Sequence, residues 1–376
     1  MTFRSAALAA LISTTLATPL ILMPGTAGAQ DELVPPEEIP AGEPAPIAEP
    51  APVGEPAPVL DPAAAEAPAP PETVSFTPDE ANLAEFTGGE LPGGKKADPL
   101  VLKLQVLLDR AGYSPGVIDG IMGDNVAKAI VAAEAAIGAP QDGVLDEAVW
   151  QGLVASQDAV LGLYTITPED LAGPFIPDLP SDYGELAKLD RSAFRTPREM
   201  FAERFHMDET LLARLNPGID FGAPGSQIVV ANPGASRSDV AVTYIIADKT
   251  RKQLLGYDAA NRLVVSYPAT IGSDELPSPS GVHKVNAVAW DAAYYYRPAV
   301  NFQQGNNKRK LTIPPGPNNP IGTTWIDLSE PTYGIHGTPE PSRIDKTNSH
   351  GCIRLTNWDA EELAGLVEKG VPVEFR

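Results

Sequence analysis

The chain has 376 residues and a formal net charge of −22 at pH 7. Its length allows about two to four domains, and its acidity argues against nucleic acid as a partner, because phosphate binding needs clustered Lys and Arg. It also argues against electrostatic adhesion to anionic lipid. Cys352 is the only cysteine, which excludes an intramolecular disulfide and a multi-cysteine zinc site, and we expect neither a metal nor an organic cofactor.

Residues 1–29 have the pattern of an export signal. Arg4 supplies a positive start, an apolar run follows over 7–23, and Ala27-Gly28-Ala29 provides small residues for a cleavage site. The apolar run is short for a membrane span, so a cleaved signal is favoured over an uncleaved anchor. No cysteine follows the run to carry a lipid. We therefore expect an exported, periplasmic protein.

Residues 30–96 are expected to form a disordered linker rich in Pro, Ala and Glu. The bias is strongest over 30–72, which lacks Lys, Arg and aromatic residues and repeats a unit of Glu-Pro-Ala-Pro followed by Ile or Val between residues 43 and 59. Such a segment cannot bury enough apolar surface to offset its ordering entropy. Its alternating prolines favour an extended polyproline II chain, so we interpret it as a solvated spacer.

Residues 97–155 are predicted to form a small helical domain. An apolar face predicts a helix over 100–108, Gly and Pro predict a turn over 112–116, and further helices are expected over 124–136 and around Trp150 and Leu153. This order resembles the three-helix peptidoglycan-binding domain. The matching residues are Leu104-Gln105, Gly112-Tyr113, Ile118-Asp119-Gly120, Gly123, Asp142-Gly143 and Trp150.

One departure from that family lies at Ala133-Glu134, where an aromatic residue followed by Gln is more common. The glycines and Trp150 can equally serve the fold. Whether this domain binds sugar or peptide is therefore left open.

Residues 156–239 are expected to be a LysM-like or connecting segment. Helices are predicted over 197–205 and 209–215, and a short strand over 227–231. This helix–helix–strand order resembles the latter part of a LysM module. The residues that carry the resemblance are Leu215-Asn216-Pro217 and Ile228-Val229-Val230. We interpret His206 as a surface or helix-end histidine.

Residues 240–376 are predicted to form one β-rich domain, large enough for its own core. Strands are expected over 243–247, 253–257, 263–267, 282–288 and 370–375, with a helix over 358–369. Gly, Pro, Asn and Asp lie in the turns between them. His283, within one of these strands, is interpreted as structural.

The segment Ser349-His350-Gly351-Cys352-Ile353-Arg354 has the composition of a nucleophile loop. Cysteine catalysis needs a thiolate, a base that forms it and donors for the oxyanion. Gly351 permits close approach of the backbone to a substrate, and the amides around Gly351 and Cys352 can serve as oxyanion donors. In an extended segment Arg354 lies on the same side as Cys352, where its charge favours the thiolate or holds a substrate carboxylate.

Two histidines are candidates for the base. His350 lies two residues before Cys352, and His336 lies 16 residues before it, within Gly334-Ile335-His336-Gly337-Thr338. Spacing alone does not choose between them.

The C-terminal domain resembles the L,D-transpeptidases of the YkuD type over residues 240–376. The signature consists of His336-Gly337-Thr338 together with the loop over 349–354. The Pro- and Ser-containing turn over 277–281, the segment over 313–322 and Trp325-Ile326 also agree with the family.

The resemblance implies a mechanism. Cys352 attacks the carbonyl that joins the third and fourth residues of a peptidoglycan stem, typically diaminopimelate and D-Ala, and His336 takes the thiol proton. The Gly337 carbonyl orients the imidazole, while His350 becomes a structural or substrate-contacting residue. The residues implied to line the pocket are Tyr333, Ser349 and Arg354.

The resemblance also implies a mostly β fold, with the cysteine loop over a sheet, and acylation of Cys352 by carbapenem-type β-lactams. The acyl acceptor is left open between a second stem, a lipoprotein lysine and water, the last of which makes an L,D-carboxypeptidase. Two other classes compete: a non-catalytic wall-binding scaffold and a general cysteine protease. The combined set of Cys352, His336, Gly337 and Arg354 argues against the scaffold, and the Pro- and Gly-rich segments before it argue against the protease.

Overall fold

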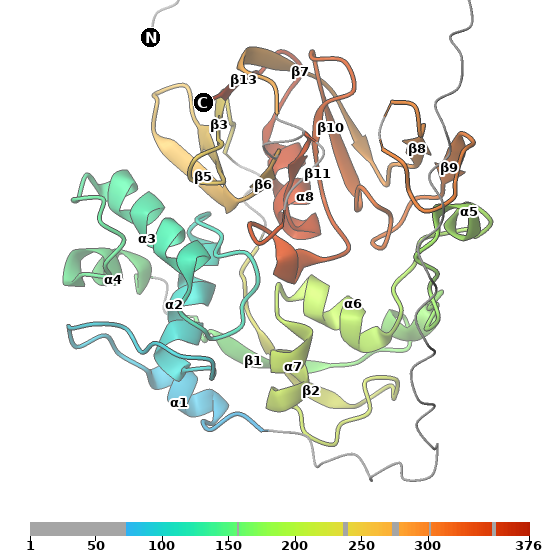
Figure 1. Ribbon diagram of the computed structural model, residues 1–376. Coiled ribbons are helices and arrows are strands. Elements are labelled where there is room, and N and C mark those ends of the chain that lie inside the picture. The colour runs from blue at the N-terminus through green and yellow to red at the C-terminus, as the bar shows by residue number, and fades with distance from the viewer. Residues whose placement is uncertain (1–72, 156–157, 236–239, 273–277, 301, 348–350) are drawn as a thin grey trace, which may run out of the picture. The chain divides into compact units, whose positions relative to one another are not determined.

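The computed structural model describes residues 73–376, apart from 156–157, 236–239, 273–277, 301 and 348–350 (Figure 1). The expected export signal and the most biased part of the linker lie outside the described residues. Of the helices that these ranges contain, none combines the length and the apolar character needed to cross a membrane.

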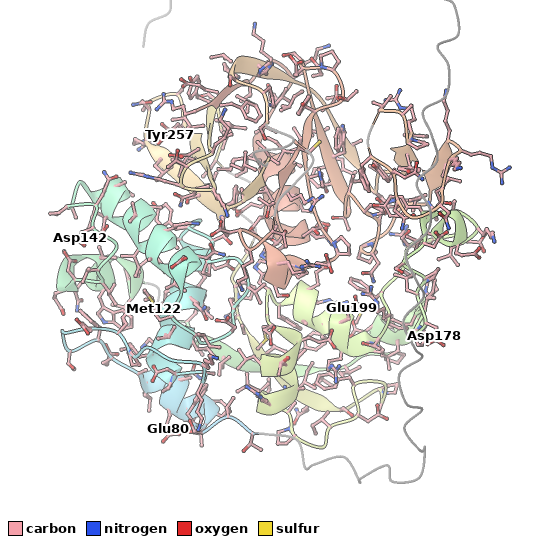
Figure 2. The ribbon with its side chains drawn as sticks, viewed as in Figure 1. Glu80, Met122, Asp142, Asp178, Glu199 and Tyr257 are labelled. Atoms are coloured by element: carbon pink, nitrogen blue, oxygen red, sulfur yellow. The ribbon has the colours of Figure 1, made fainter. Side chains whose placement is uncertain are left out.

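Residues 73–96 are ordered, which corrects the linker boundary predicted at residue 96. Helix α1 (Pro78–Leu83) begins at Thr77, which forms a reciprocal capping box with Glu80 (labelled in Figure 2). Phe76 and Phe86 on either side of this helix are buried, and the Phe86 ring lies 6.2 Å from that of Trp150. The linker composition stops near residue 72, and these two aromatic residues supply the apolar surface that holds the following segment on the helical domain.

The helical domain consists of α2 (Pro99–Arg110), α3 (Asp124–Ile137) and α4 (Glu147–Leu153), which confirms the three predicted helices. Asp98 caps α2 by accepting hydrogen bonds from two backbone amides of its first turn. The buried Gln105 on α2 donates to Asp119 and accepts from the Gly120 amide at 2.7 Å, so it ties the helix to the following turn. Glu134 likewise accepts from the Gly143 amide, which gives this departure from the family pattern a structural role.

The middle segment contains a two-stranded antiparallel sheet of β1 (Leu161–Thr165) and β2 (Gln227–Ala231). Between the two strands come η1 (Asp170–Ala172), α5 (Tyr183–Leu186), α6 (Pro197–Arg204) and α7 (Glu209–Leu215). The two predicted helices and the strand at 227–231 are confirmed. The resemblance to LysM modules stays a prediction. This segment and the helical domain share one apolar core, in which Trp150 and Phe201 are fully buried.

The C-terminal domain is built on a nine-stranded sheet in the order β5-β4-β3-β13-β7-β10-β11-β12-β6. Helix α8 (Asn357–Leu366) packs against β10 and β11. A separate pair of strands, β8 (Tyr294–Tyr296) and β9 (Leu311–Ile313), forms a small antiparallel ribbon. The sheet strands are β3 (Tyr244–Asp248), β4 (Gln253–Tyr257), β5 (Leu263–Pro268), β6 (Thr270–Ile271), β7 (Gly281–Trp290), β10 (Thr324–Leu328), β11 (Gly334–His336), β12 (Ile353–Arg354) and β13 (Pro372–Phe375).

All five strands and the helix expected in this domain are confirmed, and its separate core makes it the β-rich unit that the sequence predicts. His283 contacts the Ser280 carbonyl at 3.1 Å and packs edge-on against Phe375. These contacts fit the structural role expected for it.

The two N-terminal parts contact the C-terminal domain through polar and aromatic side chains. His206 follows α6 with a positive φ of 57°, as expected for a helix-end residue, and its ring stacks on Trp358 of α8 at 5.0 Å. Its Nδ1 lies 2.8 Å from Asp109 Oδ2. Ser114 of the helical domain donates to the buried Asp359 of α8 at 3.1 Å. The start of α8 is therefore held from both neighbouring parts of the chain.

Candidate active site

The candidate nucleophile and base lie on adjacent parallel strands. Strands β11 and β12 pair with Ile335 opposite Ile353 and His336 opposite Arg354. Ile335 and Ile353 are both fully buried in the core. Because side chains alternate along a strand, His336 and Arg354 point to the other face, and Cys352, immediately before β12, points the same way as Arg354. The sheet thus directs Cys352, His336 and Arg354 to one face.

The tautomer of His336 is fixed by its neighbour in the chain. Nδ1 of His336 lies 2.7 Å from the Gly337 carbonyl oxygen. A carbonyl can only accept, so Nδ1 carries the proton and Nε2 keeps its lone pair. The ring also stacks on Trp325 at 5.6 Å. This bond is the contact that the family resemblance implies between His336 and Gly337.

The electrostatic surroundings keep His336 neutral. The residue is only 4% exposed. Burial, together with the smaller effect of the nearby Arg354 charge, lowers the pKa of His336 from 6.5 to about 3, while the bond to Gly337 acts in the opposite direction. A neutral imidazole with a free Nε2 can accept a proton.

Cys352 is partly exposed, and its Sγ lies 3.7 Å from the Thr332 carbonyl. Burial raises the pKa of the thiol, against a backbone hydrogen bond from Gly334 and the positive charge of Arg354, which lower it. Arg354 therefore acts in the expected direction, but burial outweighs it. At neutral pH the free protein accordingly holds a neutral thiol and a neutral imidazole on the same face of the sheet.

The loop before Cys352 requires glycine at position 351. Gly351 has φ +108°, and a Cβ there would lie 2.6 Å from a ring carbon of Tyr333. Ser278 Oγ donates to the Gly351 carbonyl at 2.6 Å, which holds the loop from the segment after β6. Tyr333 thus packs beside the nucleophile loop. Ser349 and His350 lie outside the described residues, so His336 is the candidate base whose position is known.

Asn357 supports the other side of the histidine and was not predicted from sequence. A Cβ on Gly337 would lie 2.1 Å from Asn357 Oδ1, and one on Gly322 would lie 1.9 Å from the same atom. The side chain therefore fills the space that both glycines leave, directly against the turn that carries the Gly337 carbonyl.

An aromatic cluster near the site was also missed. Tyr183 of α5 packs edge-on against Tyr294 and Tyr296 of β8, at 5.9 and 5.2 Å. Burial raises the pKa of Tyr294, and the charges of Cys352 and Arg354 also act on that pKa. Burial raises the pKa of Tyr183 to about 12, and Arg354 lowers it. The run Tyr294-Tyr295-Tyr296 is the sequence signal that could have indicated this cluster.

Within the described ranges, no group of three or more His, Cys, Asp or Glu side chains is arranged to hold a metal ion.

Two family models match the chain. The L,D-transpeptidase catalytic domain, YkuD, matches residues 242–375. A domain described as "Putative peptidoglycan binding domain" matches residues 97–153. These ranges coincide closely with the expected catalytic and helical domains.

Curated relatives agree with the catalytic match. The "Putative L,D-transpeptidase YkuD" of Bacillus licheniformis is 33% identical over 179 residues, which cover 47% of this chain and 92% of that relative. The protein of the same name from Bacillus subtilis is 30% identical over 172 residues, covering 46% of this chain and 88% of that relative.

Among solved structures, L,D-transpeptidase 3 from Mycobacterium tuberculosis, in complex with a faropenem-derived adduct, is 18% identical with a TM-score of 0.30. The match covers 36% of this chain and 60% of the length of that structure.

Proposed function

The chain belongs to the family of L,D-transpeptidases, and from this premise we propose that Cys352 forms a thioester acyl-enzyme with a peptidoglycan stem peptide, with His336 as the base. The observation that carries the proposal is the bond from His336 Nδ1 to the Gly337 carbonyl. It leaves Nε2 free as a proton acceptor on the sheet face that also carries Cys352.

Acylation begins from the neutral pair. The Cys352 thiol proton moves to His336 Nε2 as the sulfur attacks the carbonyl carbon between the third stem residue and D-Ala. The resulting oxyanion accepts hydrogen bonds from the amides around Gly351 and Cys352. The imidazolium then returns the proton to the leaving amine, D-Ala departs, and a thioester remains on Cys352.

The second step resolves the thioester. An amine from a second stem attacks the thioester carbonyl, His336 accepts the proton of that amine, and the departing sulfur is reprotonated. The product is a cross-link between two stems. Water as acceptor gives the L,D-carboxypeptidase reaction instead, and a lysine of a lipoprotein gives an attached lipoprotein.

Arg354 is proposed to bind a substrate carboxylate, because its guanidinium is directed to the same face as Cys352 and matches carboxylate geometry. Tyr333, Ser349 and His350 complete the proposed pocket. Carbapenem-type β-lactams are proposed to acylate Cys352, because a lactam carbonyl offers the sulfur the same kind of electrophile as the stem peptide.

The organisation of the chain supports action on a polymer outside the cytoplasm. An export signal over 1–29 and an extended spacer would place the ordered part in the periplasm. A helical domain that binds peptidoglycan would raise the effective concentration of the catalytic domain at its substrate. These roles of the signal, spacer and helical domain are part of the proposal.

The test is turnover of a stem tetrapeptide, with D-Ala release as the readout. Wild-type protein should release D-Ala, Cys352→Ala should release none, and His336→Ala should be about 10²–10⁴-fold slower, which is the usual contribution of a positioned base. Turnover of an ordinary protein substrate but not of the tetrapeptide would contradict the proposal. A loss of thiol reactivity in His350→Ala but not in His336→Ala would reassign the base.

A further inference from the structure

Helix α6 of the middle segment places the carboxyl of Glu203 close to the turn that follows His336. Glu203 lies in the last turn of this helix, and both of its carboxyl oxygens are 3.0 Å from Asn357 Nδ2, at the start of α8. Figure 1 shows the two helices near one another, and they are in contact. Residues 203 and 357 are 154 positions apart in the chain. A part of the chain outside the catalytic domain thus reaches a residue behind the active site.

The amide of Asn357 has a single orientation that satisfies its neighbours. Asn357 is 1% exposed. Its Nδ2 donates to Glu203 and to the Pro317 carbonyl at 3.1 Å, while its Oδ1 accepts from the Thr323 amide at 3.3 Å. Reversing the amide would set its oxygen against the Pro317 carbonyl and its NH2 against the Thr323 N–H donor. Glu203 supplies the second acceptor for Nδ2 and holds the amide in this orientation against the Gly337 turn.

The other end of Asn357 lies against the catalytic turn. Asn357 Oδ1 lies against both Gly322 and Gly337, where an added Cβ would meet it. The carbonyl of the same Gly337 accepts the bond that orients His336. A continuous series of contacts therefore runs from Glu203 through Asn357 and Gly337 to the imidazole.

We propose that Glu203 is a positioning residue for the transpeptidase reaction, which holds His336 in its productive tautomer and orientation through Asn357 and the Gly337 turn. This inference rests on the proposed function, because it assigns Glu203 to the machinery of that site. It makes the middle segment part of the active-site support rather than a tether alone.

The charge state of Glu203 decides which variant mimics it. Although the residue as a whole is partly exposed, its carboxyl is enclosed, and this burial raises the pKa of Glu203 to about 8. That value includes the Asn357 donor, which lowers the pKa, and the negative charges of Glu361 on α8 and Glu199 on α6, which raise it. The carboxyl is therefore mostly neutral at pH 7, and Glu203→Gln retains a neutral acceptor for Asn357.

Glu199 offers a matched control on the same helix (labelled in Figure 2). It lies one turn before Glu203 and accepts from Asn318 Nδ2 at 3.0 Å, so it also joins α6 to the catalytic domain. Within the described part of the chain, the Glu199 carboxyl bonds to Arg195 and Asn318 and not to Asn357. Loss of Glu199 weakens the contact between α6 and the catalytic domain without removing the acceptor that orients Asn357.

The experiment measures the rate at which a carbapenem acylates Cys352 in the full chain at pH 7, with thermal midpoints recorded in parallel. Glu203→Ala should slow acylation roughly 10- to 100-fold, the range expected when a catalytic group is misplaced without being removed. Glu203→Gln should stay close to wild type. Glu199→Ala should lower the thermal midpoint without slowing acylation.

A pH profile separates positioning of the base from general damage. Above the pKa of the Cys352 thiol the sulfur is already ionised, so alkylation by iodoacetamide no longer needs a base. Glu203→Ala should therefore be slow at pH 7 and converge with wild type at high pH. If Glu203→Ala does not fold, Asn357→Leu tests the same series, because it removes the donor towards Glu203 at similar side-chain volume, and it should show the same profile.

Acylation of Glu203→Ala at the wild-type rate would overturn the inference, as would an equal slowing at every pH. A Glu203→Gln variant as slow as Glu203→Ala would also overturn it, because the neutral acceptor would then be insufficient. A wild-type protein that carbapenem does not acylate would instead remove the proposed function.

Discussion

The Cys352–His336 pair is expected to contain almost no thiolate at neutral pH. Burial lowers the pKa of His336 to about 3 and raises that of Cys352 above its ordinary value of 9.0. At pH 7 about one molecule in 10⁴ would carry an imidazolium, and at most about one in 100 a thiolate, because each pH unit changes the ratio tenfold. Both shifts favour the neutral pair, so the proton moves only when substrate is attacked.

Thiolate absorbance in the far ultraviolet measures this directly. Cys352 is the only cysteine, so the difference spectrum between wild type and Cys352→Ala reports one sulfur. In a titration from about pH 4 to about 10, absorbance should rise only above the ordinary thiol range. The spectrum should be flat around neutrality.

The contradicting result is thiolate absorbance already present near pH 6 that disappears in His336→Ala. Such a signal would indicate a preformed ion pair, whose two apparent pKa values belong to the pair together. Attraction between the imidazolium and the thiolate would then outweigh the burial of His336, and proton transfer would precede substrate binding.

Three further predictions concern stability. Folding lowers the pKa of His336 from 6.5 to about 3, so between these values the unfolded chain binds a proton that the native chain does not, and stability falls as pH drops through this window. The free energy of unfolding of His336→Gln, measured relative to wild type by urea titration, should therefore rise by about 3 kcal/mol between pH 7 and pH 4. A difference that does not change with pH would contradict the lowered pKa of His336. Gly351→Ala forces a side chain into φ +108° and against Tyr333; it should cost about 1–3 kcal/mol in the same assay and slow carbapenem acylation, whereas wild-type values for both would mean that the loop is free to move. Trp150→Ala removes a side chain that is 1% exposed and packs on Phe86; it should cost about 3–5 kcal/mol of unfolding free energy, and a loss below about 1 kcal/mol would show that the helical domain is not stabilised by this core.

Local patterns predicted the elements whose apolar residues repeat over several turns or alternations. Helices α2 and α3 and strands β3, β4 and β7 are of this kind. Strands β6, β11 and β12 have two or three residues each, too few for an alternating pattern, and they pair only because the surrounding sheet supplies partners. Helix α1 was not predicted, because it directly follows a long segment of biased composition. It is held in place by the packing of Phe76 and Phe86.

The candidate catalytic residues could be proposed from the sequence because most of them lie in one short segment, 349–354. Alternation along an extended segment places Cys352 and Arg354 on one side, and the observed register adds His336 to that side. The support behind them was not predictable. Glu203 and Asn357 are joined only by the fold, and the contact of Tyr183 with the β8 aromatics likewise joins distant parts of the chain.

The direction of the Cys352 pKa shift could not be predicted from the neighbouring residues in the sequence. The neighbouring Arg354 lowers the thiol pKa as the sequence suggests, but the larger effect is burial. Burial depends on the whole domain, so only the structure could show which of the two prevails.

The most direct test of the central proposal is the intact mass of the full chain after brief incubation with a stem tetrapeptide. Wild type should gain the mass of the stem tripeptide less one water, and digestion should place this gain on the peptide that contains Cys352. Cys352→Ala should gain nothing. An adduct of the same mass on Cys352→Ala, or D-Ala release by that variant, would show that another group performs the attack.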